Sequence, residues 1–193
     1  MKWLGQSKVL VAALIMGSAL AWTVNWEASA NDQMGSGQSL AVVVQGTAEG
    51  ELRMIDPGDG EEVEMNCFDV DLVDAASGRI VGSATGCDDL NSIEPDPSGG
   101  AGFSISNTQF FHLPGGMITT SLRTTVQPVL EGSPGITHIT GSIGDEMNIV
   151  AGTRRYQNAQ GTAHLVGAVN LAGLDGENII TFDCVFRIVL SDE

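Results

Sequence analysis

The sequence predicts an all-β protein, either a barrel or a sandwich, and three observations support that prediction. Short runs rich in β-branched residues recur through the chain and are separated by Gly, Pro, Asp and Asn. No stretch sustains the i, i+3, i+4, i+7 apolar spacing of an amphipathic helix. Turn signals such as DPGDG, EPDPSGG and LDGEN stand between the runs. Many short strands with this punctuation are typical of antiparallel barrels and sandwiches.

The start of the chain, residues 1–30, is predicted to be a signal peptide and not part of the fold. Lys2 and Lys8 give a positive beginning, an apolar run follows, and a small-x-small Ala-Ser-Ala pattern ends at Ala30. We expect cleavage between Ala30 and Asn31. The alternative is an uncleaved anchor, which is disfavoured because the apolar run is shorter than the ~20 residues of a spanning helix. We therefore expect export, either to the periplasm or out of the cell.

The remainder of the chain has the length of one domain. A Gly/Ser-rich segment, 31–39, is expected to be flexible, and 40–193 is expected to be a single β domain. After removal of the predicted signal peptide, six arginines, no lysine and 23 acidic residues remain, a formal charge of 6 − 23 = −17. Such a surface repels nucleic acid and anionic lipid, so neither nucleic acid nor a membrane is an expected partner of the cleaved protein.

The expected strands are nine runs of apolar and β-branched residues: 40–48, 63–74, 79–86, 102–111, 117–127, 136–142, 148–152, 162–171 and 178–190. Two acid-rich segments between them, 56–62 and 88–97, are interpreted as solvated loops. A calcium site in 56–62 is the alternative, and it is disfavoured because that segment lacks the alternating oxygen ligands of an EF-hand loop.

The hairpin over residues 63–87 is predicted in detail. Its turn, DAASGR, suits a three-residue loop with Gly78 in the left-handed conformation. The resulting register pairs Ala75 with Arg79, Val73 with Val81, Asp71 with Ser83, Asp69 with Thr85, and Cys67 with Cys87. Alternation then places Phe68, Val70, Leu72, Ile80, Gly82 and Ala84 on the buried face.

The same register brings Cys67 opposite Cys87 on the other, polar face of the hairpin. We therefore predict a disulfide between them, which an exported protein can keep. The alternatives are two free thiols or a bond between Cys67 and Cys184. Cys184 belongs to the apolar row of the last predicted strand, where a cysteine is most simply a small buried hydrophobe.

No catalytic or metal-binding motif is found. His112, His138 and His164 fall on three different expected strands without the close spacing of a metal-binding pair, so no metal is expected. The chain has no G-x-S-x-G elbow, phosphate-binding loop or dinucleotide fingerprint, and no cofactor is expected. Paired carboxylates such as Asp69 and Asp71 are interpreted as solvated.

The C-terminal third, residues 136–190, resembles the allene oxide cyclase and dirigent barrel superfamily. Members carry a strand, a glycine turn of the form G-[ST]-G-x-F-x-x-A-x-G, a further strand and an aromatic-rich last strand. The turn here is GTRRYQNAQG. Its matching residues are Gly152, Thr153, Ala159 and Gly161, with Tyr156 at the aromatic position. Arg154 departs from the pattern, since the family usually has glycine there.

The resemblance implies an eight-stranded antiparallel barrel, often a homotrimer, whose lumen takes an apolar molecule. Members cyclise an unsaturated fatty-acid epoxide or steer the coupling of phenolic radicals, and both activities hold a flexible substrate in one conformation. The catalytic acids of those families map onto no particular position here. Strand alternation makes four residues candidates for lining the lumen and binding a ligand: Phe103, Ile105, Phe182 and Phe186.

Two functional hypotheses follow. The first is an exported barrel that binds a small apolar ligand and acts as an isomerase, a cyclase or a stereo-directing protein. The second is a non-catalytic envelope barrel, filled with side chains, that serves structure or protein interaction. The lumen separates them, because eight strands either pack solid or enclose one ligand. An immunoglobulin-like sandwich fits the strand count but not the glycine turn.

The adjacent Arg154 and Arg155 raise the question of an anion site in this acidic chain. Adjacent side chains of an extended segment point in opposite directions, so the two cannot both line one pocket. We therefore interpret the pair as part of a connection between strands, with Tyr156 and Ala159 packing inward. At least one arginine is then expected in solvent or paired with an acid of residues 145–146.

Overall fold

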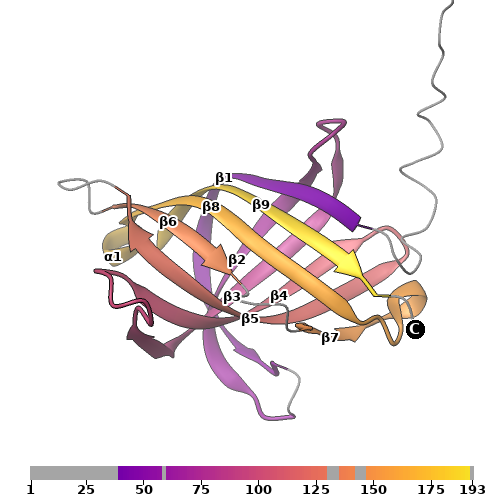
Figure 1. Ribbon diagram of the computed structural model, residues 1–193, viewed down its shortest axis with the longest axis horizontal. Coiled ribbons are helices and arrows are strands. Elements are labelled where there is room, and N and C mark those ends of the chain that lie inside the picture. The colour runs from indigo at the N-terminus through magenta and orange to yellow at the C-terminus, as the bar shows by residue number, and fades with distance from the viewer. Residues whose placement is uncertain (1–38, 58–59, 130–134, 142–146, 192–193) are drawn as a thin grey trace, which may run out of the picture. The chain divides into compact units, whose positions relative to one another are not determined.

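The computed structural model describes residues 39–57, 60–129, 135–141 and 147–191, and these form a β-barrel (Figure 1). The predicted signal peptide, with its cleavage site, and residues 31–38 lie outside the described residues. Ser39, which the sequence assigns to the flexible segment, is the first residue of the first strand. No helix in the described ranges has the length and apolar character needed to cross a membrane.

A strand is found at each of the nine predicted runs. The strands are β1 (Ser39–Ile55), β2 (Val63–Asp74), β3 (Ile80–Pro95), β4 (Phe103–Leu113), β5 (Gly116–Pro128), β6 (Ile136–Gly141), β7 (Ile149–Gly152), β8 (Gly161–Gly173) and β9 (Ile179–Leu190). Two short helical turns connect them, η2 (Arg154–Tyr156) and α1 (Leu174–Glu177).

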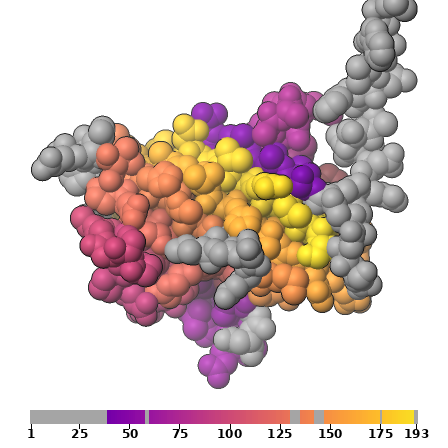
Figure 2. All heavy atoms as spheres, in the orientation of Figure 1, coloured from indigo at the N-terminus to yellow at the C-terminus, as the bar shows by residue number. Residues whose placement is uncertain are grey.

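Eight of these strands close into a ring in the order β1-β2-β3-β4-β5-β6-β8-β9, and β9 pairs back onto β1. Each pairing is antiparallel, which confirms the predicted eight-stranded antiparallel barrel and excludes the sandwich. The short β7 pairs with β5 beyond the end of β6 (Figure 1). Figure 2 shows the atoms of β8 and β9 packed side by side in the outer wall.

Asn148 completes the barrel wall in the gap between β6 and β7. Its side chain donates from Nδ2 to the carbonyl of Ala163 at 2.9 Å and accepts at Oδ1 from the Ala163 N–H at 2.7 Å. Its backbone carbonyl accepts from the N–H of Ser121 on the other side at 3.0 Å. A side-chain amide thus supplies the hydrogen bonds that a neighbouring strand would otherwise give to β8.

The predicted register of the β2–β3 hairpin is confirmed over most of its length. Cys67 pairs with Cys87, Asp69 with Thr85, and Asp71 with Ser83. Gly78 has a φ of 67°, the left-handed conformation that its place in the turn predicts.

Next to the turn the predicted register is wrong. Val73 pairs with Ile80 and not with Val81, so β3 carries one extra residue there. The predicted Ala75–Arg79 pair is also shifted, because the N–H of Asp74 donates to the carbonyl of Arg79 at 2.9 Å. Since one inserted residue moves its neighbour to the opposite face, Ile80 is 66% exposed and does not belong to the core.

Two strands extend by seven residues or more beyond their predicted ends. β1 continues to Ile55, where residues 50–55 extend its pairing with β2. β3 continues to Pro95, so most of the segment 88–97 is strand and its interpretation as a solvated loop is wrong. Asp and Asn favour turns locally, but pairing with β4 overrides that preference.

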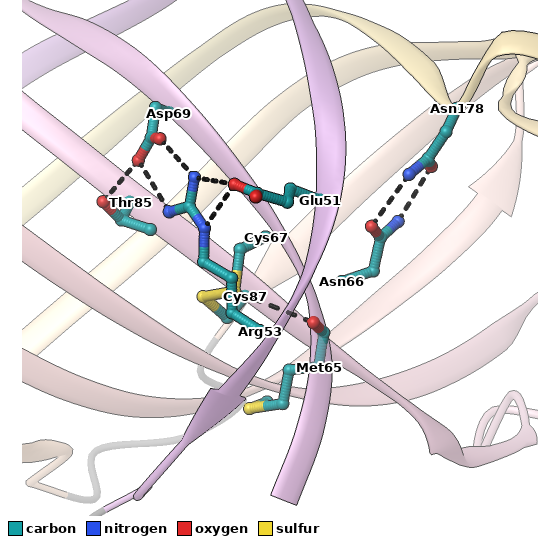
Figure 3. The surroundings of a disulfide bond; sticks show 9 residues. All are labelled: Glu51, Arg53, Met65, Asn66, Cys67, Asp69, Thr85, Cys87 and Asn178. Atoms are coloured by element: carbon teal, nitrogen blue, oxygen red, sulfur yellow. Dashed lines mark hydrogen bonds and ion pairs between the residues drawn. A yellow bond between two sulfur atoms is a disulfide. The ribbon is translucent and has the colours of Figure 1, made fainter.

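The predicted disulfide between Cys67 and Cys87 is present and lies outside the barrel wall (Figure 3). Both residues are fully buried, in a small apolar cluster formed with Met65, Phe110 and the nearby Ile55 and Val63. Alternation alone predicts that the cysteines lie on a polar surface. They are buried instead, because the extended ends of β1 and β2 cover them. Disulfides are typical of oxidising compartments, which agrees with export.

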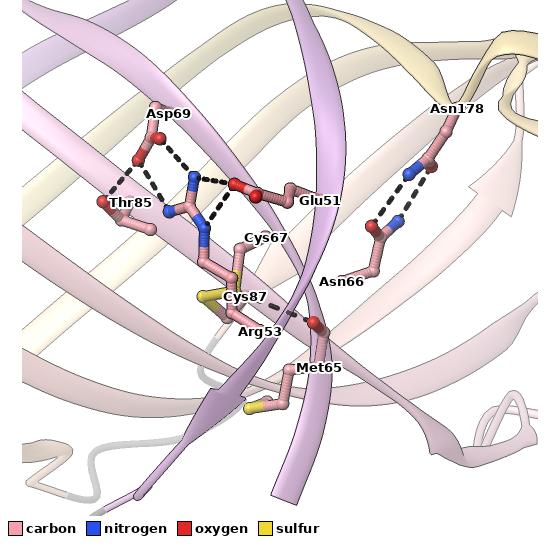
Figure 4. A network of polar contacts seen from close by, with 9 residues as sticks. All are labelled: Glu51, Arg53, Met65, Asn66, Cys67, Asp69, Thr85, Cys87 and Asn178. Carbon is pink, nitrogen blue, oxygen red and sulfur yellow. Dashed lines mark hydrogen bonds and ion pairs between the residues drawn. A yellow bond between two sulfur atoms is a disulfide. The ribbon is translucent and has the colours of Figure 1, made fainter.

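A polar network lies beside this cluster on the outer face (Figure 4). Arg53 donates to Asp69 at 2.7 Å and to Glu51 at 2.8 Å, and the Thr85 hydroxyl donates to Asp69 at 2.6 Å. The hydrogen bond from Arg53 is the main cause that lowers the pKa of Asp69. Asp69 and Asp71 are exposed, as predicted.

The glycine turn holds the tip of the β4–β5 hairpin. Tyr156 is buried and its hydroxyl donates to the carbonyl of Pro114 at 3.2 Å. The Arg155 N–H donates to the carbonyl of Gly115 at 3.3 Å, and its guanidinium lies 5.4 Å from the centre of the Tyr156 ring. Both arginines are exposed, and the segment is a tight turn instead of an extended one. The expected acids at 145–146 lie outside the described residues.

We predict that Arg154→Gly stabilises the protein by about 0.5–1 kcal/mol in urea unfolding. Arg154 has a φ of 53°, a left-handed conformation that is costly for any residue with a Cβ. Part of the gain is offset because glycine increases the entropy of the unfolded chain. Arg155→Gly is the matched control and should destabilise, since Arg155 has no positive φ and contacts Tyr156. A lower unfolding midpoint for Arg154→Gly would contradict this account.

Candidate functional site: a cavity in half of the barrel

The barrel interior has a packed half and a hollow half. The packed half is filled by the largest fully buried apolar side chains, Val42, Leu72, Phe111, Ile118 and Ile188. Phe111 packs edge to face against Phe186, with ring centres 5.0 Å apart, and Phe186 also lines the cavity beyond. The floor of the hollow half is therefore an aromatic pair.

The cavity has a volume of about 150 Å³, and all four predicted lumen residues line it: Phe103, Ile105, Phe182 and Phe186. The wall formed by β6, β8, β9 and the adjoining part of β1 is apolar, and its members are Val44, Ile139, Leu165, Val169, Leu171, Ile180, Phe182, Cys184 and Phe186. Phe182 of β9 packs edge to face on Phe68 of β2, with ring centres 5.9 Å apart, and β1 lies between these two strands in the barrel.

The opposite wall carries a polar belt, which we define as Asn66, Asp88, Asn107, Gln109 and Thr124. Strand register explains why these residues gather. Asn66 on β2 pairs with Asp88 on β3, and Asp88 pairs with Asn107 on β4. Paired residues of neighbouring antiparallel strands point to the same face. The three side chains therefore form one row across three strands, pointing into the cavity.

Among the described residues that line the cavity, Asp88 is the only charged one. No residue in the described part of the chain gives its carboxyl a hydrogen bond or an ion pair. It keeps some accessible surface, which we assign to the cavity because Asp88 lines it. Removal from bulk water raises the pKa of this carboxyl from an ordinary 3.8 to about 7.

The amides beside Asp88 are held by other partners. Asn66 and Asn178 exchange two hydrogen bonds of 3.0 Å, which fixes the turn after α1 at the rim of the cavity (Figure 4). Asn107 donates from Nδ2 to the hydroxyl of Thr124, while its Oδ1 is buried and accepts no hydrogen bond from the described residues. The amides of Asn66 and Asn107 are therefore engaged with partners other than Asp88, and Asn107 leaves one buried acceptor unsatisfied.

Gly86 makes room for the remaining member of the belt. A Cβ at this position would lie 2.6 Å from Oε1 of Gln109, closer than real Cβ contacts. The glycine thus allows the Gln109 amide to lie across β3 within the lumen.

The mouth of the cavity is apolar. Leu90 and Ile93 line the cavity and are nevertheless 47% and 49% exposed, so they form a lip between the interior and solvent. Leu174 of α1 lies on the lining beside the end of β8.

Cys184 is a buried free thiol on the apolar wall, as the sequence predicts. Burial raises its pKa to about 11, so the thiolate that a nucleophile requires is not formed near neutral pH. The three histidines lie on β4, β6 and β8, and the described residues contain no group of three side chains suited to hold a metal ion.

Asp88 is the charged lining residue that the sequence does not predict. It lies in the segment 88–97, interpreted as a loop, although the register of the hairpin indicates its inward direction. If Cys67 and Cys87 face outward together, alternation requires the next residue, Asp88, to face inward, provided that the strand continues.

Neither protein-family models nor curated proteins gave a match to this chain. The functional assignment therefore rests on the barrel and its cavity.

Proposed function

We propose that this protein is an exported barrel that binds one small, largely apolar molecule in the hollow half of its lumen. The observation that carries the proposal is the cavity of about 150 Å³, lined on one side by aliphatic and aromatic residues and opened by an apolar lip. A cavity of this volume has room for a benzene-sized molecule against its apolar wall. The alternative, a barrel filled with side chains, describes the packed half of the interior only.

The resemblance of residues 136–190 to allene oxide cyclase and dirigent barrels supports the same proposal and extends it. In that superfamily a barrel lumen orients a flexible substrate, and orientation alone contributes strongly to rate. An isomerase, cyclase or stereo-directing activity is consistent with a chain that lacks a catalytic motif. The predicted signal peptide and the buried disulfide support export to the periplasm or the cell exterior.

Ligand binding is tested with toluene and two valine variants of β8. Val169 lines the cavity and is buried, whereas Val166 is 50% exposed on the outer face. We expect saturating toluene to raise the melting temperature of the wild type and of Val166→Phe, because a ligand that binds the native state stabilises it. Val169→Phe fills the cavity and should show no such rise.

The same proteins are examined by NMR, where toluene should shift signals of the lining residues. A wild type without a thermal or spectral response to saturating toluene would overturn the proposed function. An equal response of Val169→Phe would place the binding site elsewhere and would overturn it as well.

A further inference from the structure

The described residues of the cavity lining include one acidic group and no cationic one. Asp88 lies in the middle of β3 and lines the cavity. Along the strand it stands between two other lining residues, Gly86 and the lip residue Leu90. None of the lining residues in the described part of the chain is an arginine, a lysine or a histidine. An uncompensated carboxylate in an apolar cavity is costly to the fold unless it is neutralised.

The two amides whose residues pair with Asp88 are engaged elsewhere, and no cation is found among the described residues of the lining. Asn66 is engaged by Asn178, and the Nδ2 of Asn107 is engaged by Thr124, which leaves the Oδ1 of Asn107 facing no donor among the described residues. A molecule that brings N–H donors to this row satisfies both Asp88 and this orphan acceptor. A molecule that brings only acceptors satisfies neither.

The charge of the whole protein favours the same kind of molecule. The chain has a formal net charge of −16, which attracts cations to its surface and repels anions. The mouth of the cavity adds apolar residues. A cation with an apolar body is therefore complementary both to the acidic surface of the protein and to the apolar mouth.

We propose that the ligand of this barrel is an apolar amine, whose ring or short chain occupies the apolar wall and whose protonated nitrogen pairs with Asp88. The inference rests on the proposed function, since it names the class of ligand for the same cavity. Asp88 and Cys184 are the two titratable residues among the described residues of the lining, and the thiol is neutral near neutral pH. The pH dependence of binding therefore reports on Asp88.

The test compares toluene, benzyl alcohol and benzylamine, three ligands of one size that differ in the polar group, by calorimetry at pH 8. We expect benzylamine to bind the wild type at least about tenfold more tightly than benzyl alcohol, since buried charge pairs and charge-assisted hydrogen bonds exceed neutral ones. In Asp88→Asn this preference should disappear while the affinity for toluene is kept. Asp89→Asn is the matched control, because Asp89 does not line the cavity, and it should keep the preference.

A pH series on the wild type supplies a second readout that needs no variant. Affinity for benzylamine should fall about tenfold per pH unit once the pH is below the pKa of Asp88, because only the ionised fraction is competent. Affinity for toluene should stay constant over the same range. Benzyl alcohol binding as tightly as benzylamine, or an unchanged amine preference in Asp88→Asn, would overturn the inference and leave the proposed function intact. Failure of toluene to bind at all would instead count against the proposed function.

Discussion

Loss of the disulfide between Cys67 and Cys87 is expected to lower the free energy of unfolding by about 3 kcal/mol. The bond closes a loop with a sequence separation of 20, and a cross-link of that span restricts the unfolded chain by about this amount. The native state also contributes, because both cysteines are fully buried among Met65 and Phe110. Their removal leaves part of that cluster without contacts.

The measurement is urea unfolding of the wild type, oxidised and reduced, and of the double variant Cys67→Ala/Cys87→Ala. Reduction keeps both sulfur atoms in place, so it isolates the cross-link, while the double variant adds the loss of packing. We expect the order of stability to be oxidised, reduced, double variant.

Cys184→Ala is the matched control. It removes a buried thiol that takes no part in the cross-link, so its unfolding midpoint should stay sensitive to reducing agent in the same way as that of the wild type. An unfolding curve of the wild type that does not change on reduction would show that the cross-link contributes nothing to stability.

The disulfide also bears on the candidate site through strand register. Cys67 and Cys87 are each the direct neighbour of a member of the polar belt, Asn66 and Asp88. A slip of one residue between β2 and β3 would turn Asp88 out of the cavity. The cross-link prevents that slip from outside the barrel while it leaves the lumen free for a ligand.

The barrel itself could be predicted from local patterns. Three local signals agree on a β-barrel: the nine β-branched runs, the turn residues between them and the alternation of the last strand. Agreement between such signals is expected of a sequence that specifies one fold. The predicted lumen positions of Phe182 and Phe186 follow from that alternation, because a strand has only two faces.

The errors arise where a tertiary pairing overrides a local preference. The acids and asparagines after Cys87 are typical of a loop, but β4 provides a partner for this segment and keeps it in the sheet. The extra residue at Val81 reverses the faces near the turn, which alternation without a partner strand cannot reveal. The hollow half is lined by residues from all eight strands of the ring, so no single run of sequence indicates it.

The stability of the protein is expected to fall as the pH rises from 4 to 8, and Asp88 is expected to cause a large part of that fall. Its pKa is about 7 in the folded state and 3.8 is the ordinary value, so the folded state holds the proton more tightly than the unfolded state. The unfavourable contribution is therefore absent below pH 3.8, grows between the two values and is complete above pH 7.

The replacement Asp88→Asn removes this charge with little change of shape. A pKa difference of that size corresponds to at most about 4 kcal/mol, and since the carboxyl keeps some accessible surface we expect about 2 kcal/mol at pH 8. Asp88→Asn should thus be more stable than the wild type at pH 8 and equally stable near pH 4. Urea unfolding across this pH range measures the difference directly.

Asp69→Asn on the outer face of the same hairpin is the control with the opposite sign. The pKa of Asp69 is lowered by its hydrogen bond from Arg53, so its contribution is favourable above its ordinary pKa and is lost as the pH falls. Its ion pair is exposed, and the variant should lose less than about 1 kcal/mol at pH 8. If Asp88→Asn were instead less stable than the wild type at pH 8, Asp88 would have a partner within the fold, and the cavity would hold no uncompensated acid for a ligand to neutralise.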